Sequence, residues 1–323
     1  MVSGRTARRW ASLPRGFPDA DAWEGAHIAI PGQKASARGR LALRAVLGRD
    51  SPCGMETAPG IAPVSVTSPA PAKKAGTLGY FWFIAQIVTV ALVYLIASTG
   101  PTIPAIIDAV QNGTDPEDAL TSMATLASVV LGMAGGLLVC WLWLRSEGRV
   151  AEVFDLTRPP PGGWRKALAW AAGATVAIVA IFLVGAPLVE ALGMETPDAS
   201  FVLDFVTESP LMFTLWVLGV AWLAAGLGEE LLYRGFLMDR LERLRGIGNS
   251  TAAVLIIQAV LFGLPHAYQG AGGMVLTGSI GLLLGWVRLR FGGNLWACVL
   301  AHGAVDTIMM SLAYADKLGW VQV

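Results

Sequence analysis

The fold class is decided by residues 211–237, which read LMFTLWVLGVAWLAAGLGEELLYRGFL. Most of this stretch is apolar, and it is longer than the roughly 20 residues that a helix needs to cross a bilayer. It nevertheless contains two adjacent carboxylates, Glu229 and Glu230, followed by Arg234. Charges within an apolar helix are costly, so this stretch predicts a membrane helix that faces a functional interior.

Comparable apolar stretches recur along most of the chain. Of its 323 residues, 54% are hydrophobic and only 14% are charged, a balance that soluble domains rarely show. We predict an all-α integral membrane protein with a bundle of about seven transmembrane helices. The predicted spans lie near residues 78–98, 121–144, 167–189, 211–237, 251–268, 273–288 and 295–315.

The loops between these spans are alternately acidic and basic. The loops at residues 99–120 and 190–210 carry acids without Lys or Arg, whereas basic residues follow the second, fourth and sixth spans. Because basic loops stay in the cytoplasm, we expect a cytoplasmic N-terminus and an outside C-terminus. The basic residues are Arg145, Arg149, Arg158, Arg165, Lys166, Arg240, Arg243, Arg245, Arg288 and Arg290. The balance of 23 Lys and Arg against 23 Asp and Glu suggests no nucleic-acid partner.

The N-terminal part differs from the rest in composition. Residues 1–76 are rich in Arg, Ala, Gly, Ser and Pro, which predicts a disordered cytoplasmic tail, and Met55 is an alternative start of translation. Residues 77–166 would then hold two N-terminal transmembrane helices. The three cysteines, at positions 53, 140 and 298, are far apart, which predicts isolated thiols. Small residues at Gly278, Gly281 and Gly285 predict close helix packing.

Titratable side chains are concentrated in the last four spans. Glu230 and Arg234 are four residues apart and can pair along one helix, which leaves Glu229 as the freer carboxylate. His302 and Asp306 have the same spacing and share a face of the last span, while His266 lies in the fifth.

The individual signals have ordinary explanations as well. Glu229, Glu230 and Arg234 alone could form a snorkelling cluster at a helix end. A single histidine in a span commonly makes an interhelical hydrogen bond. A proton-coupled transporter could use the same groups, although we see no internal repeat. The whole set indicates a functional site without selecting the reaction.

The motifs that these residues form resemble those of the CPBP family of intramembrane proteases. That family includes type II CAAX prenyl endopeptidases and bacteriocin-immunity proteins, once called the abortive-infection (ABI) family. Its motifs EExxxR, FxxxH and HxxxN or HxxxD match in order and spacing. They fall on Glu229, Glu230 and Arg234, on Phe262 and His266, and on His302 and Asp306. The resemblance implies a helical intramembrane protease core at residues 167–316.

The resemblance also implies roles for these residues. Glu229 resembles the general base that activates water, with His266 orienting or sharing that proton. His302 and Asp306 resemble the pair that supports the oxyanion or completes a metal site. Glu230, Arg234 and Phe262 are expected to be structural.

The cofactor question has two answers at this stage. Either no cofactor is obligatory, or Glu229, His266, His302 and Asp306 hold one divalent metal ion such as zinc. Asp306 departs from the Asn of prenyl-endopeptidase members. Because an ionised Asp cannot donate a hydrogen bond to an oxyanion, Asp306 would have to be protonated, orient His302, or bind a metal ion.

The predicted helix boundaries place Glu229 and His266 at different depths. Glu229 lies near the cytoplasmic end of its span, whereas His266 lies about 22 Å into a span that starts in the cytoplasm. For the two to meet, we expect the fourth helix to begin later and project beyond the membrane, with Arg240, Arg243 and Arg245 in water. We also expect the start of the fifth helix to lie in the cytosol.

The expected function is an intramembrane endopeptidase that cleaves a peptide or membrane-anchored protein substrate at the lipid bilayer. The alternative is a non-catalytic immunity or scaffold protein that uses the same fold. A composition rich in Ala, Gly and Arg predicts a bacterial plasma membrane, where prenylated CAAX substrates are not expected.

Overall fold

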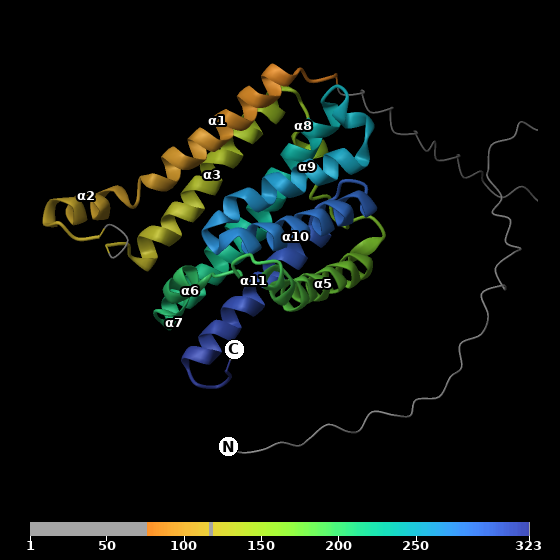
Figure 1. Cartoon of the computed structure of the whole chain (residues 1–323). Helices are drawn as coiled ribbons and strands as arrows, with labels where there is room; N and C mark the ends of the chain where they lie inside the picture. The colour runs from red at the N-terminus through yellow and green to blue at the C-terminus, as the bar shows by residue number, and fades with distance from the viewer. Residues whose placement is uncertain (1–75, 116–118, 323) are drawn as a thin grey trace, which may run out of the picture. The chain divides into compact units, whose positions relative to one another are not determined.

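The computed structural model describes residues 76–115 and 119–322 (Figure 1). Over this part of the chain, the backbone is almost entirely helical, with one isolated bridge between Leu78 and Leu244. The predicted tail, Met55 and Cys53 lie outside the described residues. The helices are α1 (Tyr80–Thr99), α2 (Ile103–Asn112), α3 (Ser122–Ser146), α4 (Val150–Val153), α5 (Gly163–Ala191), α6 (Ser200–Thr207), α7 (Pro210–Trp216), η1 (Val217–Leu237), α8 (Met238–Arg243), η2 (Ile247–Asn249), α9 (Thr251–Gly263), η3 (Leu264–Gln269), α10 (Gly270–Arg290) and α11 (Trp296–Lys317).

Six helical runs of the described chain are long and apolar enough to cross a membrane, which confirms the all-α membrane class. They are Tyr80–Thr99, Ser122–Ser146, Gly163–Ala191, Pro210–Arg243, Thr251–Arg290 and Trp296–Lys317. The predicted spans correspond to these runs, except that the fifth and sixth predicted spans fall within the single run Thr251–Arg290.

That run folds back on itself as the hairpin of α9 and α10 (Figure 1). A Cβ atom on Gly263 would lie 2.5 Å from the carbonyl oxygen of Met274, and one on Gly281 would lie 3.1 Å from Cα of Ala259. Since the residue numbers fall in one helix as they rise in the other, the two helices are antiparallel. The glycines permit this close approach, as their spacing predicts. With 13 residues, α9 is only about 20 Å long, shorter than the hydrocarbon core.

Hydroxyl side chains begin three of the long runs. Thr121, Ser209 and Ser250 each accept a hydrogen bond from the backbone N–H three residues later. These caps satisfy N–H groups that the first turn of a helix leaves without a partner. Pro210 follows its cap at the first helical position, where a missing N–H costs nothing.

The helix that carries the EExxxR motif is unusually wide. Val217–Leu237 form a π-helix of 21 residues, continuous with α7 before it and α8 after it. π-Helical hydrogen bonds reach five residues back, and such segments are commonly single turns at functional sites. Side chains four residues apart still lie on nearly the same side, so the motif spacing remains meaningful.

Helix α11 is packed by several other elements and is the most buried of the spanning runs. It contacts η1, α5 and α10. Its interface with α5 consists of small side chains on both sides, which lets the two helices approach closely. These residues are Ala167, Ala171 and Ala174 of α5 with Ala297, Cys298 and Ala301 of α11. Cys140 and Cys298 are both free and buried, which confirms two of the three isolated thiols.

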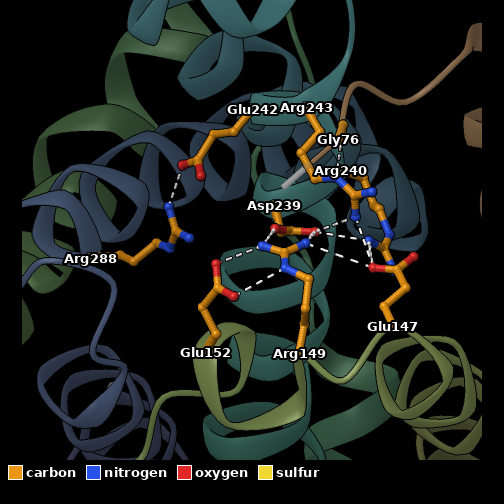
Figure 2. Close-up of polar contacts among 9 residues, drawn as sticks. All are labelled: Gly76, Glu147, Arg149, Glu152, Asp239, Arg240, Glu242, Arg243 and Arg288. Atoms are coloured by element: carbon orange, nitrogen blue, oxygen red, sulfur yellow. Dashed lines mark hydrogen bonds and ion pairs between the residues drawn. The ribbon is translucent and has the colours of Figure 1, made fainter. Parts of the chain in front are cut away.

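A cluster of ion pairs joins α3, α4 and α8 at one end of the bundle (Figure 2). Arg149 lies 2.6 Å from Asp239, and Glu147 accepts hydrogen bonds of 2.8 Å from both Arg240 and Arg243. The Arg240 side chain is completely buried, so the expectation that it lies in water is wrong. Arg240 is thus paired with acids of the protein, whereas Arg245 just beyond the helix end is exposed.

The geometry of this cluster shifts the pKa values of its acids. Burial alone would raise the pKa of Glu147, but hydrogen bonds and charge from Arg240 and Arg243 outweigh it and hold the pKa below its ordinary value. The hydrogen bond from Arg149 likewise lowers the pKa of Glu152. Both acids are therefore more firmly ionised in the folded protein than in the unfolded chain.

Candidate active site

The buried pair of Glu230 and Arg234 lies at the base of the site. Their side chains are completely buried, and Nη1 of Arg234 donates a 3.0 Å hydrogen bond to Oε1 of Glu230. This is the contact that the spacing of four residues predicts. The guanidinium of Arg234 also lies over the ring of Phe262, 4.0 Å from its centroid. The charge of Glu230 is thus matched within the protein.

His302 on α11 faces this pair. Its Nδ1 lies 2.8 Å from Oε1 of Glu230, a hydrogen-bond distance that fixes the orientation of the imidazole ring. Its Nε2 points the other way, 3.9 Å from Oε2 of Glu229 and 3.7 Å from Oδ2 of Asp306. One nitrogen is therefore held by the buried acid, and the other faces two further carboxylates.

The accessibility of the three acids separates them into two kinds. Glu230 is completely buried, whereas the side chains of Glu229 and Asp306 retain 21% and 29% of their exposure. Within the described residues, Oε2 of Glu229 has no hydrogen-bond partner. Glu229 therefore presents an uncommitted oxygen toward His302, which agrees with its expected role as the freer carboxylate.

A close backbone approach brings η1 and α11 together at this level. A Cβ atom on Gly226 would lie 3.1 Å from Cα of Gly303, and one on Gly303 would lie 2.7 Å from the ring of Trp222. Gly226 precedes Glu229 by less than one turn, and Gly303 follows His302 directly. Two glycines therefore set the distance between the helices that carry the site. Their positions beside the motifs were the only sequence signal for this role.

His266 lies apart from the other three candidates. It sits in the 3₁₀ turn between α9 and α10, where its own backbone is not helical (φ −88°, ψ 17°). Its Nδ1 makes a 3.0 Å hydrogen bond with the carbonyl oxygen of Phe262, which leaves Nε2 toward the half-exposed side. Among the described residues, His302 is the histidine in ion-pair range of Glu229, with its Nε2 3.9 Å from Oε2.

The ring of Phe262 packs beside both histidines. Its centroid is 5.4 Å from that of His266 and 6.1 Å from that of His302, with the rings tilted or edge-on. Tyr233 packs edge-on against the same ring at 5.0 Å. Phe262 is almost completely buried, and its ring packs near both imidazoles.

Three tyrosines that the sequence did not single out lie in the region of Glu229. The hydroxyl groups of Tyr94, Tyr233 and Tyr268 are all within electrostatic range of its carboxylate. Tyr268 also lies beside His266, with the rings stacked at 6.1 Å. Tyr94 belongs to α1, far away in the sequence, and no local pattern marks it.

The arrangement does not fit a metal ion held by the four candidates. In the part of the chain that the structure describes, no three His, Cys, Asp or Glu side chains are grouped so that they could hold one. Nδ1 of His302 is hydrogen-bonded to Glu230 and Nδ1 of His266 to the carbonyl oxygen of Phe262, so these two atoms are not available as ligands. The geometry instead resembles an acid–imidazole–acid arrangement suited to proton transfer.

The helix that carries Glu229 extends beyond its predicted end. The helix with Glu229 continues to Arg243, so Glu229 lies in the middle of a 34-residue run. His266 lies in η3, just after the short α9, and His302 lies in the second turn of α11.

Comparison with known proteins supports this reading of the motifs. The sequence profile of the family described as "Type II CAAX prenyl endopeptidase Rce1-like" matches residues 211–308. The matched segment runs from the start of α7 into α11 and contains every motif residue from Glu229 to Asp306. Comparisons with curated proteins and with solved structures found no match. Residues 211–308 are therefore similar to the Rce1-like type II CAAX prenyl endopeptidases, which the three motifs also resemble.

Proposed function

We propose that the chain is an intramembrane endopeptidase in which Glu229 activates a water molecule to cleave a peptide bond. The observation that carries this proposal is the position of the Nε2 atom of His302, 3.9 Å from Glu229 and 3.7 Å from Asp306. These separations are too long for direct hydrogen bonds and suit a single bridging water. A water held there would contact both a general base and an imidazole.

The chemical step needs only the side chains at the site. Glu229 takes one proton from water while the water oxygen bonds to the carbonyl carbon of the substrate, and the π-electron pair moves to the carbonyl oxygen. The tetrahedral intermediate then collapses, and the C–N bond breaks. The leaving amine receives the proton that Glu229 took, which regenerates the carboxylate.

Glu230 and Arg234 assist this step by holding the imidazole ring of His302 in one orientation. With Nδ1–H of His302 donated to Glu230, Nε2 of the neutral ring is the acceptor, or a donor once the ring is protonated. The buried ion pair thus fixes which imidazole nitrogen faces the reaction. This is a positioning role, because neither Glu230 nor Arg234 reaches the accessible side of the site.

Asp306 fits the second of the three roles that the sequence allowed. Its carboxylate lies one helical turn from His302 and 3.7 Å from Nε2. An ionised Asp306 would stabilise positive charge on His302 and orient the bound water. It accepts hydrogen bonds in this role and does not need to donate to the oxyanion.

His266 is assigned to the substrate side of the site. Its Nδ1 is held by a backbone carbonyl, which leaves Nε2 for the scissile carbonyl group or the leaving amine. Tyr268, stacked beside it, lines the same side. The predicted sharing of a proton with Glu229 passes to His302 in this proposal.

The substrate is expected to be a peptide or membrane-anchored protein, since the site lies within spanning helices. The test compares new protein N-termini in membranes of cells that express the wild type, Glu229→Ala or Glu190→Ala at equal levels. Glu190 is an exposed acid at the end of α5 and serves as the matched control. Terminal-peptide mass spectrometry should find cleavage sites that the wild type and Glu190→Ala share and that Glu229→Ala lacks. Identical profiles in all three would instead favour the non-catalytic immunity or scaffold alternative.

A further inference from the structure

Helix α1 lies outside the family-matched segment, yet it runs antiparallel to the helix that carries Glu229. The N–H of Leu78 donates to the carbonyl of Arg243, at the end of α8. Further along α1, Val90 packs in one cluster with Phe236 of η1. As the residue number rises by 12 along α1, it falls by seven along its partner. The level is given more closely through α3, where Gly132 meets Tyr94 of α1 and the next residue, Met133, meets Gly228 beside Glu229.

Tyr94 lies on the inner stripe of α1. Gln86, Val90 and Tyr94 follow each other at intervals of four, and the first two are buried. The Tyr94 ring lies against a glycine face of α3, where Cβ atoms on Gly132 and Gly136 would be 3.2 Å and 3.9 Å from it. The ring is thus confined between α1 and α3 and its position is defined.

The direction of the ring places its hydroxyl toward the site. Gly136 meets the Cβ end of the side chain, whereas Gly132 meets the Cζ end that bears the oxygen. The residue after Gly132, Met133, packs against Gly228, the neighbour of Glu229. The hydroxyl is within electrostatic range of both Glu229 and Tyr233. Among the hydrogen bonds of the described residues, none involves this hydroxyl group, so its donor is free.

We infer that the Tyr94 hydroxyl donates a hydrogen bond to the substrate carbonyl oxygen as it becomes the oxyanion. This inference rests on the proposed hydrolysis at Glu229. The Tyr94 hydroxyl would supply the hydrogen-bond donor to the oxyanion that an ionised Asp306 cannot supply. Helix α1, which lies outside the family-matched segment, would then contribute a catalytic residue. A donor aimed at the developing charge is worth about 10² to 10³ in kcat when it is removed.

The experiment uses the full-length protein in membranes and measures the rate of cleavage at a Glu229-dependent site. Tyr94→Phe retains the ring that packs on Gly132 and removes only the hydroxyl. Tyr314→Phe is the matched control, because Tyr314 stacks on Phe213 and takes no part in the site. We expect Tyr94→Phe to lower kcat about 10²-fold with KM changed little, and Tyr314→Phe to match the wild type.

The outcomes separate this inference from the proposed function. Glu229-dependent cleavage that proceeds equally fast with Tyr94→Phe overturns the inference and leaves the protease intact. The absence of any Glu229-dependent site overturns both. If Tyr94→Phe lowers the folded yield, 3,5-difluorotyrosine at position 94 retains the hydroxyl and strengthens it as a donor. The cleavage rate must then change, and an unchanged rate contradicts the assignment.

Discussion

At the scale of single residues, the buried pair of Glu230 and Arg234 connects stability with chemistry. Both side chains are completely buried, and Glu230 also accepts the hydrogen bond from His302. Removing one member of a buried ion pair leaves a charge without a partner, which costs about 3 to 5 kcal/mol. We therefore expect Glu230→Met alone to lower the thermal stability of the purified protein strongly.

The double variant Glu230→Met with Arg234→Met distinguishes the two roles. Apolar side chains of similar volume often replace a buried ion pair without loss of stability. The double variant should regain most of the thermal stability while remaining inactive, because His302 has lost the acceptor that orients it. Thermal unfolding and cleavage assays on the same preparation check this. A stable double variant that cleaves normally would show that Glu230 does not position His302.

The motif residues show which contacts can be predicted from sequence spacing alone. Intervals of four residues correctly predicted that Glu230 pairs with Arg234 and that His302 and Asp306 lie together, because helix geometry is local. The contact between Glu230 and His302 spans 72 positions and depends on how two helices pack. Sequence spacing carries no information on such a contact, so the packing of His302 against Glu230 could not be predicted from the sequence.

At the scale of helices, the contact between η1 and α11 depends on Gly303. A methyl group there would lie 2.7 Å from the Trp222 ring, so Gly303→Ala must push the helices apart or move the indole. Overpacking of this kind costs about 1 to 3 kcal/mol. A displacement near 1 Å at a reacting group can cost about 10²-fold in rate. We expect Gly303→Ala to lose most of its activity.

Gly173→Ala is the matched control for this change. Gly173 also lies in a spanning helix, but a Cβ atom on it would have no neighbour within 4 Å. Cleavage rate and thermal stability should both stay near wild-type values in Gly173→Ala. Equal activities in the Gly303 and Gly173 variants would contradict the claim that this helix contact sets the geometry of the site.

The helix boundaries were predicted well where polar loops or capping residues interrupt the apolar runs. The fifth and sixth predicted spans are joined by only a short turn, and the structure forms one helical run there with a sharp reversal. The π-helical winding of Val217–Leu237 had no sequence signal, because it arises from packing along the whole segment. The sequence also did not show which face of α1 packs against the other helices, since α1 is apolar on nearly all sides.

At the scale of the whole molecule, the ion-pair cluster in Figure 2 ties α3, α4 and α8 together and reaches Gly76 before α1. The pKa values of Glu147 and Glu152 are lowered in the folded protein. Their contribution to stability is therefore complete above the ordinary glutamate pKa of 4.5 and is lost as the pH falls through the lower folded values. We expect the melting temperature to fall below about pH 4.5.

The control for this pH dependence is the variant Glu147→Gln, which cannot titrate at that position. Its melting temperature should be lower than that of the wild type at neutral pH and should change less on acidification. A wild-type protein whose melting temperature stays constant between neutral pH and pH 3 would contradict a stabilising role for these ion pairs.

The central claim is that Glu229 activates water for peptide-bond hydrolysis, and reconstitution tests it most directly. Purified wild-type protein and Glu229→Gln are placed in liposomes with a peptide that contains a cleavage site found in cells, and the products are identified by mass spectrometry. The account predicts cleavage at the same bond by the wild type and a loss of at least about 10²-fold in rate for Glu229→Gln. Equal cleavage by both proteins, or by neither, would contradict it.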